Sequence, residues 1–368
     1  MNPAISNISE ESDVYRFTLS GTNVSLANAL RRTILSDIPI TVIETETEAV
    51  NKCIIAVNTG RLHNEILKQR LSCIPIHVKN LDELPDKYIL EVDYTNDTEN
   101  IMYVTTEHFR LRNKESGAYL SKEKTREIFP PCILTNTYID FARLRPQMGD
   151  GLPGEQLKLT AEFSVSNAKQ NSMYNVVSKC AYGNTPDRAK IAEVWEEQDA
   201  KFRSDGVSRE DIDFQKKNFE ILDAQRYFQA DSFDFVIQTI GIYDNRELVY
   251  KACAILQNKI IDIIQSLDSD TVAIIASQTT IENCFDVFLD NEDYTIGKVL
   301  EYILYEKHYM GDKTLSFCGF KKFHPHDTDS RIRIAFDKKG DKTNVKQYLR
   351  EACVDAQEFF KTVYKMFK

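Results

Sequence analysis

A strand–turn–helix pattern occurs twice in this sequence of 368 residues, once near each end. The first copy runs from residue 17 to residue 36 and the second from 287 to 304, and the two align without gaps at an offset of 270. Ser25 corresponds to Thr295, and the apolar positions Leu30 and Leu300 coincide. A repeat of this kind predicts two copies of one folding module within the chain.

The first repeated helix is expected to begin at Ser25, whose hydroxyl can accept an N–H of the first turn. One helical face is apolar, while the opposite face places a leucine beside two arginines. This arrangement predicts a second buried surface that a partner protein covers. A solvated face with one stray leucine is the alternative. The residues predicted to bind the partner are Asn28, Arg31, Arg32 and Leu35.

The second repeated helix has Glu301 and Tyr302 where the first has its two arginines. The copies therefore share a core face and differ on the outer face, so their partners are expected to differ. A module of this size cannot bury both faces alone, and docking one copy on the other solves the problem. The residues predicted to form this internal interface are Leu26, Leu30, Leu256, Ile260, Ile263, Ile296, Leu300, Leu349, Phe359 and Phe360.

The expected fold class is α+β, with two related dimerisation modules, each an antiparallel sheet covered by helices, docked as an intramolecular pseudo-dimer. The first module is assigned to residues 1–80 plus 155–267, and the second to 281–368, after a linker at 268–280. Residues 81–154 are predicted to form a β-rich insertion, because short alternating runs are separated by turn signals. Residues 1–12 are expected to be frayed, and residues 186–228 to form charged helices.

The composition limits the classes of function. Lys and Arg number 46 against 56 Asp and Glu, a net charge of −10, which argues against a freestanding nucleic-acid binder. The eight cysteines form no C-x-x-C pair, which is typical of a reducing compartment. Without a signal peptide or a long apolar run, the protein is expected in the cytosol or the nucleus.

Several motifs resemble those of the α-type scaffold subunits of multisubunit DNA-directed RNA polymerases. Asn28-Ala-Leu-Arg-Arg32 followed by Ile38-Pro39 is similar to the third-largest subunit of RNA polymerase II. The second module resembles the eleventh subunit through Asp293-Tyr-Thr-Ile-Gly297 and Arg331-Ile-Arg-Ile334. Cellular versions are two separate chains. The fused order looks like that of nucleocytoplasmic large DNA viruses.

The resemblance implies a non-catalytic scaffold on which the two largest polymerase subunits assemble for transcription, with tenth- and twelfth-subunit-like polypeptides as further partners. Direct DNA binding and membrane association are not expected. A viral origin implies the virion and the cytoplasmic viral factory, or the nucleus, as its location. Third subunits usually carry a zinc cluster in the inserted domain, but here that region holds only Cys132, so neither a metal nor a cofactor is expected.

Other readings remain open. A scaffold of a polymerase I/III-type or archaeal-type enzyme is a near alternative, and a freestanding interaction adaptor is a more distant one. An enzyme would have to use Glu44, Glu46 and Glu48, expected along one side of a strand, or the pair His324 and His326. The acidic pairs Asp211/Asp213 and Asp268/Asp270 are expected in a charged helix and a linker. A basic run from Arg110 to Arg126 is expected to be a solvated surface.

Overall fold

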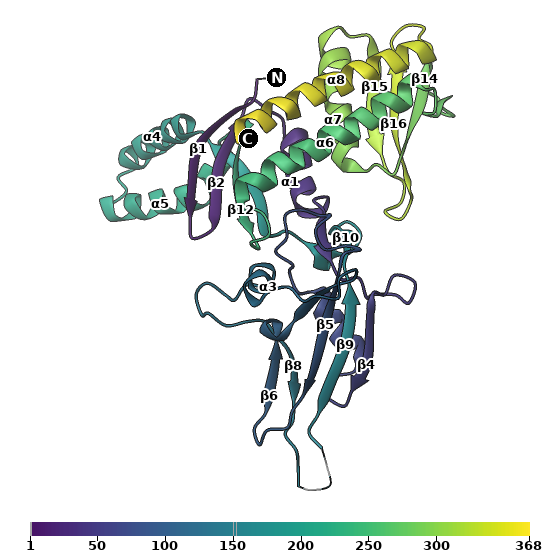
Figure 1. Ribbon diagram of the computed structural model, residues 1–368. Helices are drawn as coiled ribbons and strands as arrows, with labels where there is room; N and C mark the ends of the chain where they lie inside the picture. The colour runs from purple at the N-terminus through teal and green to yellow at the C-terminus, as the bar shows by residue number, and fades with distance from the viewer. Residues whose placement is uncertain (1, 150, 152) are drawn as a thin grey trace. The chain divides into compact units, whose positions relative to one another are not determined.

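The computed structural model describes residues 2–149, 151 and 153–368. The chain divides into two compact units (Figure 1). The first unit contains the residues up to 34, together with 179–238 and 245–368, and the second contains residues 35–178 and 239–244. The second expected module lies wholly in the first unit, whereas residues 35–80 and 155–178 of the expected first module lie in the second unit. The first unit is α+β, as expected.

The first module is a four-stranded sheet in the order β1-β2-β12-β11, with two helices of its own. β2 is paired antiparallel with both β1 and β12, and Phe17 lies opposite Phe235 in this pairing. The alternating apolar side chains of β2 are buried, as a strand with one covered face requires. The elements are β1 (Ala4–Glu11), β2 (Val14–Ser20), α1 (Val24–Ser36), β11 (Val177–Pro186), β12 (Phe228–Thr239) and α6 (Asn245–Asp268).

The second module repeats this topology with the strand order β13-β14-β16-β15. Its first helix continues into a π-helical segment, η4 (Tyr305–Gly311). Each module therefore runs through two strands, a helix, two further strands and a long helix. The remaining elements are β13 (Ile274–Ala276), β14 (Cys284–Asp290), α7 (Tyr294–Leu304), β15 (Leu315–Lys321), β16 (Asp329–Phe336) and α8 (Lys342–Phe367).

The N-terminal caps of the two repeated helices differ from the expectation. Ser25 does not cap α1; instead the side chain of Asn23 accepts the Ser25 N–H at 2.8 Å. Asp293, the equivalent residue of the second module, accepts the Thr295 N–H at 2.7 Å. Asx side chains two residues before the serine and threonine cap both helices, because their carbonyl oxygens reach a free N–H of the first turn.

Two charged helices interrupt the first module between β11 and β12. They are α4 (Arg188–Ser204) and α5 (Arg209–Ile221), and a short 3₁₀ turn, η3 (Asp223–Arg226), follows them. Asp187 and Ser208 cap the two helices through their side chains. Gly206 separates them with φ of 73°, a left-handed conformation that glycine adopts without strain. The charged helices expected at 186–228 are therefore present.

The second unit contains a four-stranded sheet in the order β4-β9-β5-β7 and two-stranded pairs β6-β8 and β10-β3. Its core is a single apolar cluster that includes Leu71, Leu90, Phe109, Phe141 and Leu159. The strands are β3 (Ile40–Val42), β4 (Cys53–Asn58), β5 (Tyr88–Thr95), β6 (Met102–Thr105), β7 (Arg110–Asn113), β8 (Asp140–Leu144), β9 (Gln156–Glu162) and β10 (Ser164–Ser166). The helices are α2 (Asn64–Ser72), η1 (Thr106–His108), α3 (Lys122–Ile128) and η2 (Ser172–Tyr174).

Several boundaries differ from the expectations. The N-terminal residues are not frayed, because β1 is paired along β2. The inserted unit is larger than 81–154, because β9 lies between β4 and β5 instead of returning to the first module. The linker contains β13, which is paired with β14. The strand expected to carry three glutamates ends at Val42, before the first of them.

Candidate assembly interface

The long helices of the two modules pack along each other in antiparallel orientation, visible in Figure 1 as the adjacent α6 and α8. At one end, Arg246 donates to the Phe367 carbonyl at 2.6 Å and the Tyr250 and Tyr364 rings meet edge to face at 5.9 Å. At the other end, Arg350 of α8 contacts Asp268 of α6 at 3.1 Å. The two helices are thus in register along most of their length.

The end of the second module enters the core of the first. Phe367, the last residue of α8, is buried, and its ring packs edge to face on Phe17 with 4.9 Å between centroids. Phe17 in turn stacks on Phe235 at 5.0 Å with the rings nearly parallel. Three aromatic rings from β2, β12 and α8 therefore form one continuous cluster, which buries a large apolar area.

All ten residues assigned to the internal interface are buried in the structure. Leu256, Ile260 and Ile263 lie on α6, on the buried stripe of a helix that packs against α8. Leu349, Phe359 and Phe360 lie on the buried stripe of α8, which contacts both α6 and α7. Leu26 and Leu30 lie on α1, and Ile296 and Leu300 lie on α7.

Arg32 joins the two modules, so its assignment to the outward partner surface needs correction. Its Nε donates to the Thr295 hydroxyl at 2.9 Å, and another guanidinium nitrogen contacts Asp293 at 3.2 Å. Asp293 is also the cap of α7. The arginine of one repeated helix therefore binds the acidic cap of the other. The Asp293 carboxylate attracts the guanidinium, although the positive end of the helix dipole there disfavours a cation. The sequence contains a signal for the caps of these helices, because residues 23–25 and 293–295 are equivalent in the repeat.

The other three residues assigned to the partner surface are partly exposed. The Arg31 guanidinium is held on its own helix, where Nε and a terminal nitrogen donate to the Asn28 side chain at 3.0 and 2.8 Å. Leu35 is half-buried near the end of α1. Arg31 thus has a fixed position on α1 and bonds to no carboxylate among the hydrogen bonds and ion pairs that the structure describes.

The acidic and histidine candidates do not form a reaction centre. Asp211 bonds its own helix cap, Ser208, and Asp268 and Asp270 bind basic residues of α8. His324 and His326 lie in an exposed turn, where the His326 N–H donates to the His324 ring at 3.1 Å. Across the residues that the structure describes, no group of three or more His, Cys, Asp or Glu is arranged to hold a metal ion.

The cysteines are all free thiols, and most of them are buried. Burial raises the pKa of the Cys53 thiol to about 11 and that of Cys180 to about 12. Such thiols stay protonated and act as small apolar side chains. Cys132 is exposed, and it is the one cysteine in the sequence of the expected insertion at 81–154. A closed zinc site needs four ligands, which the cysteines of this segment do not supply.

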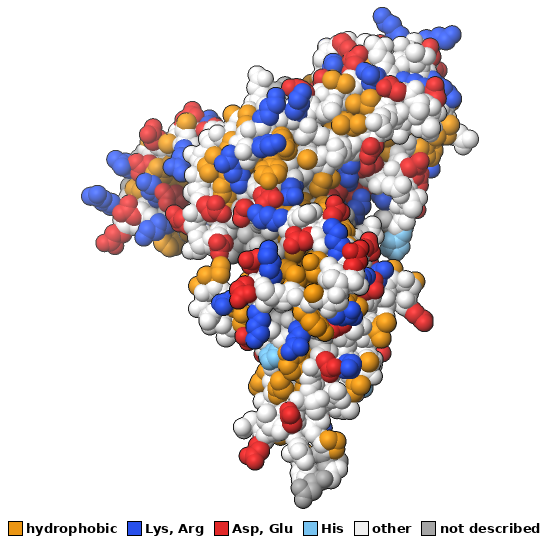
Figure 2. Space-filling view, in the orientation of Figure 1, with side chains coloured by type: hydrophobic (Ala, Val, Ile, Leu, Met, Phe, Trp, Pro, Cys, Tyr) orange, Lys and Arg blue, Asp and Glu red, His pale blue; other side chains and the backbone are white. Residues whose placement is uncertain are grey.

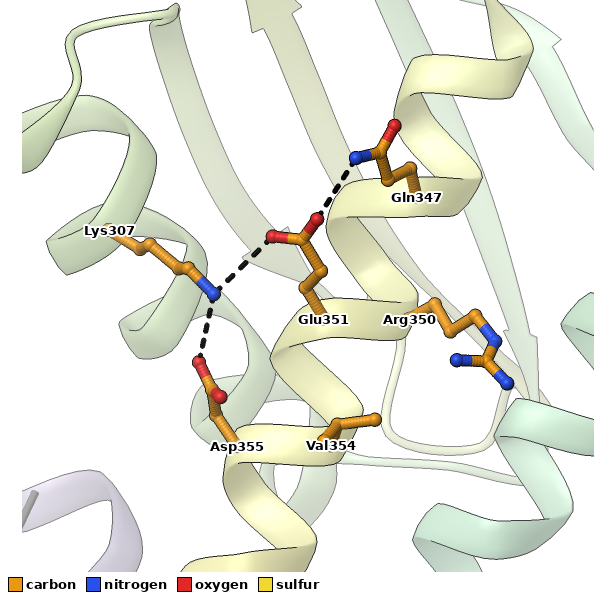
Figure 3. A pocket seen from close by; sticks show the side chains of 6 residues that line it. All are labelled: Lys307, Gln347, Arg350, Glu351, Val354 and Asp355. Carbon is orange, nitrogen blue, oxygen red and sulfur yellow. Dashed lines mark hydrogen bonds and ion pairs between the residues drawn. The ribbon is translucent and has the colours of Figure 1, made fainter.

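A pocket of about 360 Å³ lies where η4 meets α8 (Figure 3). Lys307 reaches from η4 to Glu351 and Asp355 on α8, at 3.3 and 3.2 Å, and Gln347 donates to Glu351 at 3.0 Å. Next to it the buried His308 ring stacks on Tyr348 at 3.8 Å. Lys307 thus fastens η4 to α8 through two carboxylates, which is a structural role.

Known families match both modules. A family model described as the RNA polymerase Rpb3/Rpb11 dimerisation domain matches residues 16–260, and a second model with this description matches residues 284–365. DNA-directed RNA polymerase II subunit RPB3 of Schizosaccharomyces pombe is 26% identical over 283 residues, which cover 72% of this chain and 87% of the relative.

More distant relatives match shorter stretches. DNA-directed RNA polymerase subunit Rpo3 of Pyrococcus furiosus is 39% identical over 69 residues, 19% of this chain and 24% of the relative. RPAC1 of human DNA-directed RNA polymerases I and III is 39% identical over 61 residues, 17% of this chain and 16% of the relative. No described helix is both long and apolar enough to cross a membrane. The first family match alone spans more than half of the sequence, so the chain belongs to the RNA polymerase Rpb3/Rpb11 dimerisation-domain family.

Proposed function

We propose that this protein is a non-catalytic assembly scaffold of a DNA-directed RNA polymerase, in which one chain supplies both halves of the Rpb3/Rpb11-type dimer. The observation that supports it most strongly is the antiparallel packing of α6 on α8 between two matched family domains. Because both halves are in one chain, their pairing is intramolecular, with an effective concentration of about millimolar. Such a preformed dimer offers a fixed platform to larger subunits.

The proposed partners are the largest and second-largest subunits, with tenth- and twelfth-subunit-like polypeptides beside them. Asn28, Arg31 and Leu35 on α1 are the residues proposed to contact a large subunit. The mixed charge supports protein contacts over DNA contacts: on the face seen in Figure 2, basic and acidic side chains are interspersed, and the net charge is −10. No metal or cofactor enters this role.

The polymerase is proposed to be of the polymerase II-like type that nucleocytoplasmic large DNA viruses encode, located in the virion and the host cytoplasm. The fusion of both domains in one chain supports this, and the RPB3 match covers most of the chain. The scaffold of a polymerase I/III-type or archaeal-type enzyme is the second candidate, supported by the Rpo3 and RPAC1 matches.

The test is co-expression with the two largest polymerase subunits encoded by the same genome, followed by affinity purification on this chain. Both subunits should co-purify with the unaltered chain and be lost with Arg31→Glu, while its melting temperature stays unchanged. The matched control is Lys217→Glu, a charge reversal on the exposed side of α5. If neither large subunit co-purifies with the unaltered chain, the function is wrong. If Arg31→Glu retains both, only the assignment of this face is wrong.

A further inference from the structure

A groove of about 750 Å³ lies in the second unit. Its walls come from β5, η1, β7, the start of α3 and the segment that leads to β8. Its lining includes Thr106, Arg110, Tyr119, Lys122 and Arg126. A volume of this size accommodates several side chains of a bound segment.

The groove divides the basic run of this unit into two sets. Arg112, Lys114 and Lys124, which do not line it, pair with Glu91, Glu162 and Glu127 at 2.7, 3.2 and 3.9 Å.

The three basic residues that line the groove form no ion pair among the described residues; they are Arg110, Lys122 and Arg126. A purely solvated basic surface gives no reason for this division. A groove that receives negative charge does, because its cations must be left available.

A buried hydroxyl adds an independent observation. Thr106 lines the groove, is only 1% exposed, and its Oγ1 has no hydrogen-bond partner among the described residues. A buried hydroxyl without a partner is unfavourable by about 1–3 kcal/mol in mutational data, and such groups are commonly satisfied by ordered water or by a bound group. Apolar surface is also available, since the Tyr119 ring is half-exposed at the rim.

The loop before Tyr138, another residue that lines the groove, presents two unprotected aliphatic side chains. Ile133 is 94% exposed and Leu134 is 93% exposed. The loop is closed on itself, because the Cys132 N–H donates to the Thr137 carbonyl at 2.8 Å. Exposed aliphatic side chains on an ordered loop suit a protein partner more than a nucleic acid.

We propose that this groove docks an acidic segment of a partner protein, with carboxylates on Arg110, Lys122 and Arg126 and apolar side chains against Tyr119. Glu107 and Glu123 also line the groove and would repel a continuous phosphate backbone, whereas a peptide can place its charges between them. The site lies in the second unit and does not depend on the proposed polymerase function.

The test measures binding to the full chain by fluorescence anisotropy, with a labelled peptide that alternates glutamate and leucine around one phenylalanine. A peptide with glutamine in place of glutamate and an oligothymidylate strand are the comparison probes. The variant is Lys122→Glu with Arg126→Glu. Its matched control is Lys124→Glu, which reverses a charge on the same helix outside the groove.

The acidic peptide should bind the unaltered protein. Its affinity for the double variant should be about tenfold lower or more, consistent with the loss of close charge pairs. Its affinity for Lys124→Glu should be unchanged. The glutamine peptide and the oligothymidylate should bind weakly and equally to all three proteins. Failure of the acidic peptide to bind, equal loss in the control, or preferential binding of oligothymidylate that the double variant abolishes would each overturn the proposal. Melting temperatures of all variants show whether a loss reflects unfolding.

Discussion

The two modules of the first unit have the same topology but differ in what interrupts it. β2 and β14 begin and end at equivalent positions of the repeat, and Asn23 and Asp293 cap equivalent helices. The first module is interrupted by the whole second unit and by α4 and α5, whereas the second has only short connections. The shared order of strands and helices therefore tolerates large insertions between its elements, while the surface on which the two modules dock is retained.

The modules also differ inside the shared frame. Asp286 of the second module is buried and accepts two bonds from Arg333, at 2.6 and 2.8 Å, but its counterpart in the first module is Arg16. Gly297 of α7 corresponds to Ala27 of α1.

The strongest test of the shared docking surface is Phe360→Asp in α8. Phe360 is fully buried where α8 packs, so an unpaired carboxylate there should reduce the free energy of unfolding by more than about 4 kcal/mol. Val354→Asp is the control, because Val354 is exposed on the same helix and its replacement should change stability by less than about 0.5 kcal/mol. Equal melting temperatures for both variants would contradict a docked pair.

The buried Asp286–Arg333 ion pair should make the stability of the chain sensitive to acid. The Arg333 hydrogen bonds hold the pKa of Asp286 below its usual value. A lowered folded-state pKa adds stability that is present above the unfolded pKa of about 4 and is lost as the pH falls through the folded value. Asp286→Asn should be less stable by about 1–3 kcal/mol at neutral pH. Urea titrations between neutral and acid pH should show this difference shrinking; a constant difference would contradict it.

At position 297 the second module has no room for the alanine side chain that the first module carries at the equivalent position, Ala27. A Cβ built at this position would lie 2.0 Å from the Phe320 ring, because β15 packs closely on α7. Gly297→Ala should therefore lower stability by about 1–3 kcal/mol through overpacking, despite the higher helix propensity of alanine. The double variant Gly297→Ala with Phe320→Leu should recover part of the loss in thermal melts. A stabilised single variant would show that the close packing is wrong.

Removing the Arg32 side chain should have the smallest effect on stability of these changes. Its bonds to Thr295 and Asp293 are partly exposed, with 36% of the Arg32 side chain and 25% of the Asp293 side chain accessible. Arg32→Ala should therefore reduce the free energy of unfolding by about 1 kcal/mol, less at high salt. Arg31→Ala is the control, because Arg31 bonds only Asn28 among the described hydrogen bonds. Equal losses in urea denaturation would mean that Arg32 does not link the modules.

Much of the first unit could be predicted from the sequence, because the repeat places apolar residues at helical and strand spacing. Leu256 and Phe360 were assigned to the core by periodicity alone, and both are buried. The orientation of polar side chains could not be predicted in this way. Arg31 and Arg32 are adjacent on one helical face. Of the two, only Arg32 bonds a helix cap, Asp293, which lies 261 residues further along the chain.

The inserted unit was harder to predict, since strand partners depend on contacts between distant segments. The alternation of Leu157 and Leu159 is typical of a strand, but it does not reveal that β4 and β5 are the neighbours of this strand. The polar N-terminal strand β1 was missed because it has no apolar alternation and is held by pairing with β2.

The most direct test of the central claim is to cut the folded chain between α6 and β13. A specific protease site placed within residues 269–273 would leave both modules intact, because these residues lie outside helices and strands. After cleavage, the account predicts that the two fragments co-elute at the mass of the uncut chain in size-exclusion chromatography and melt in one transition. Fragments that elute separately, each folded, would contradict an intramolecular pseudo-dimer.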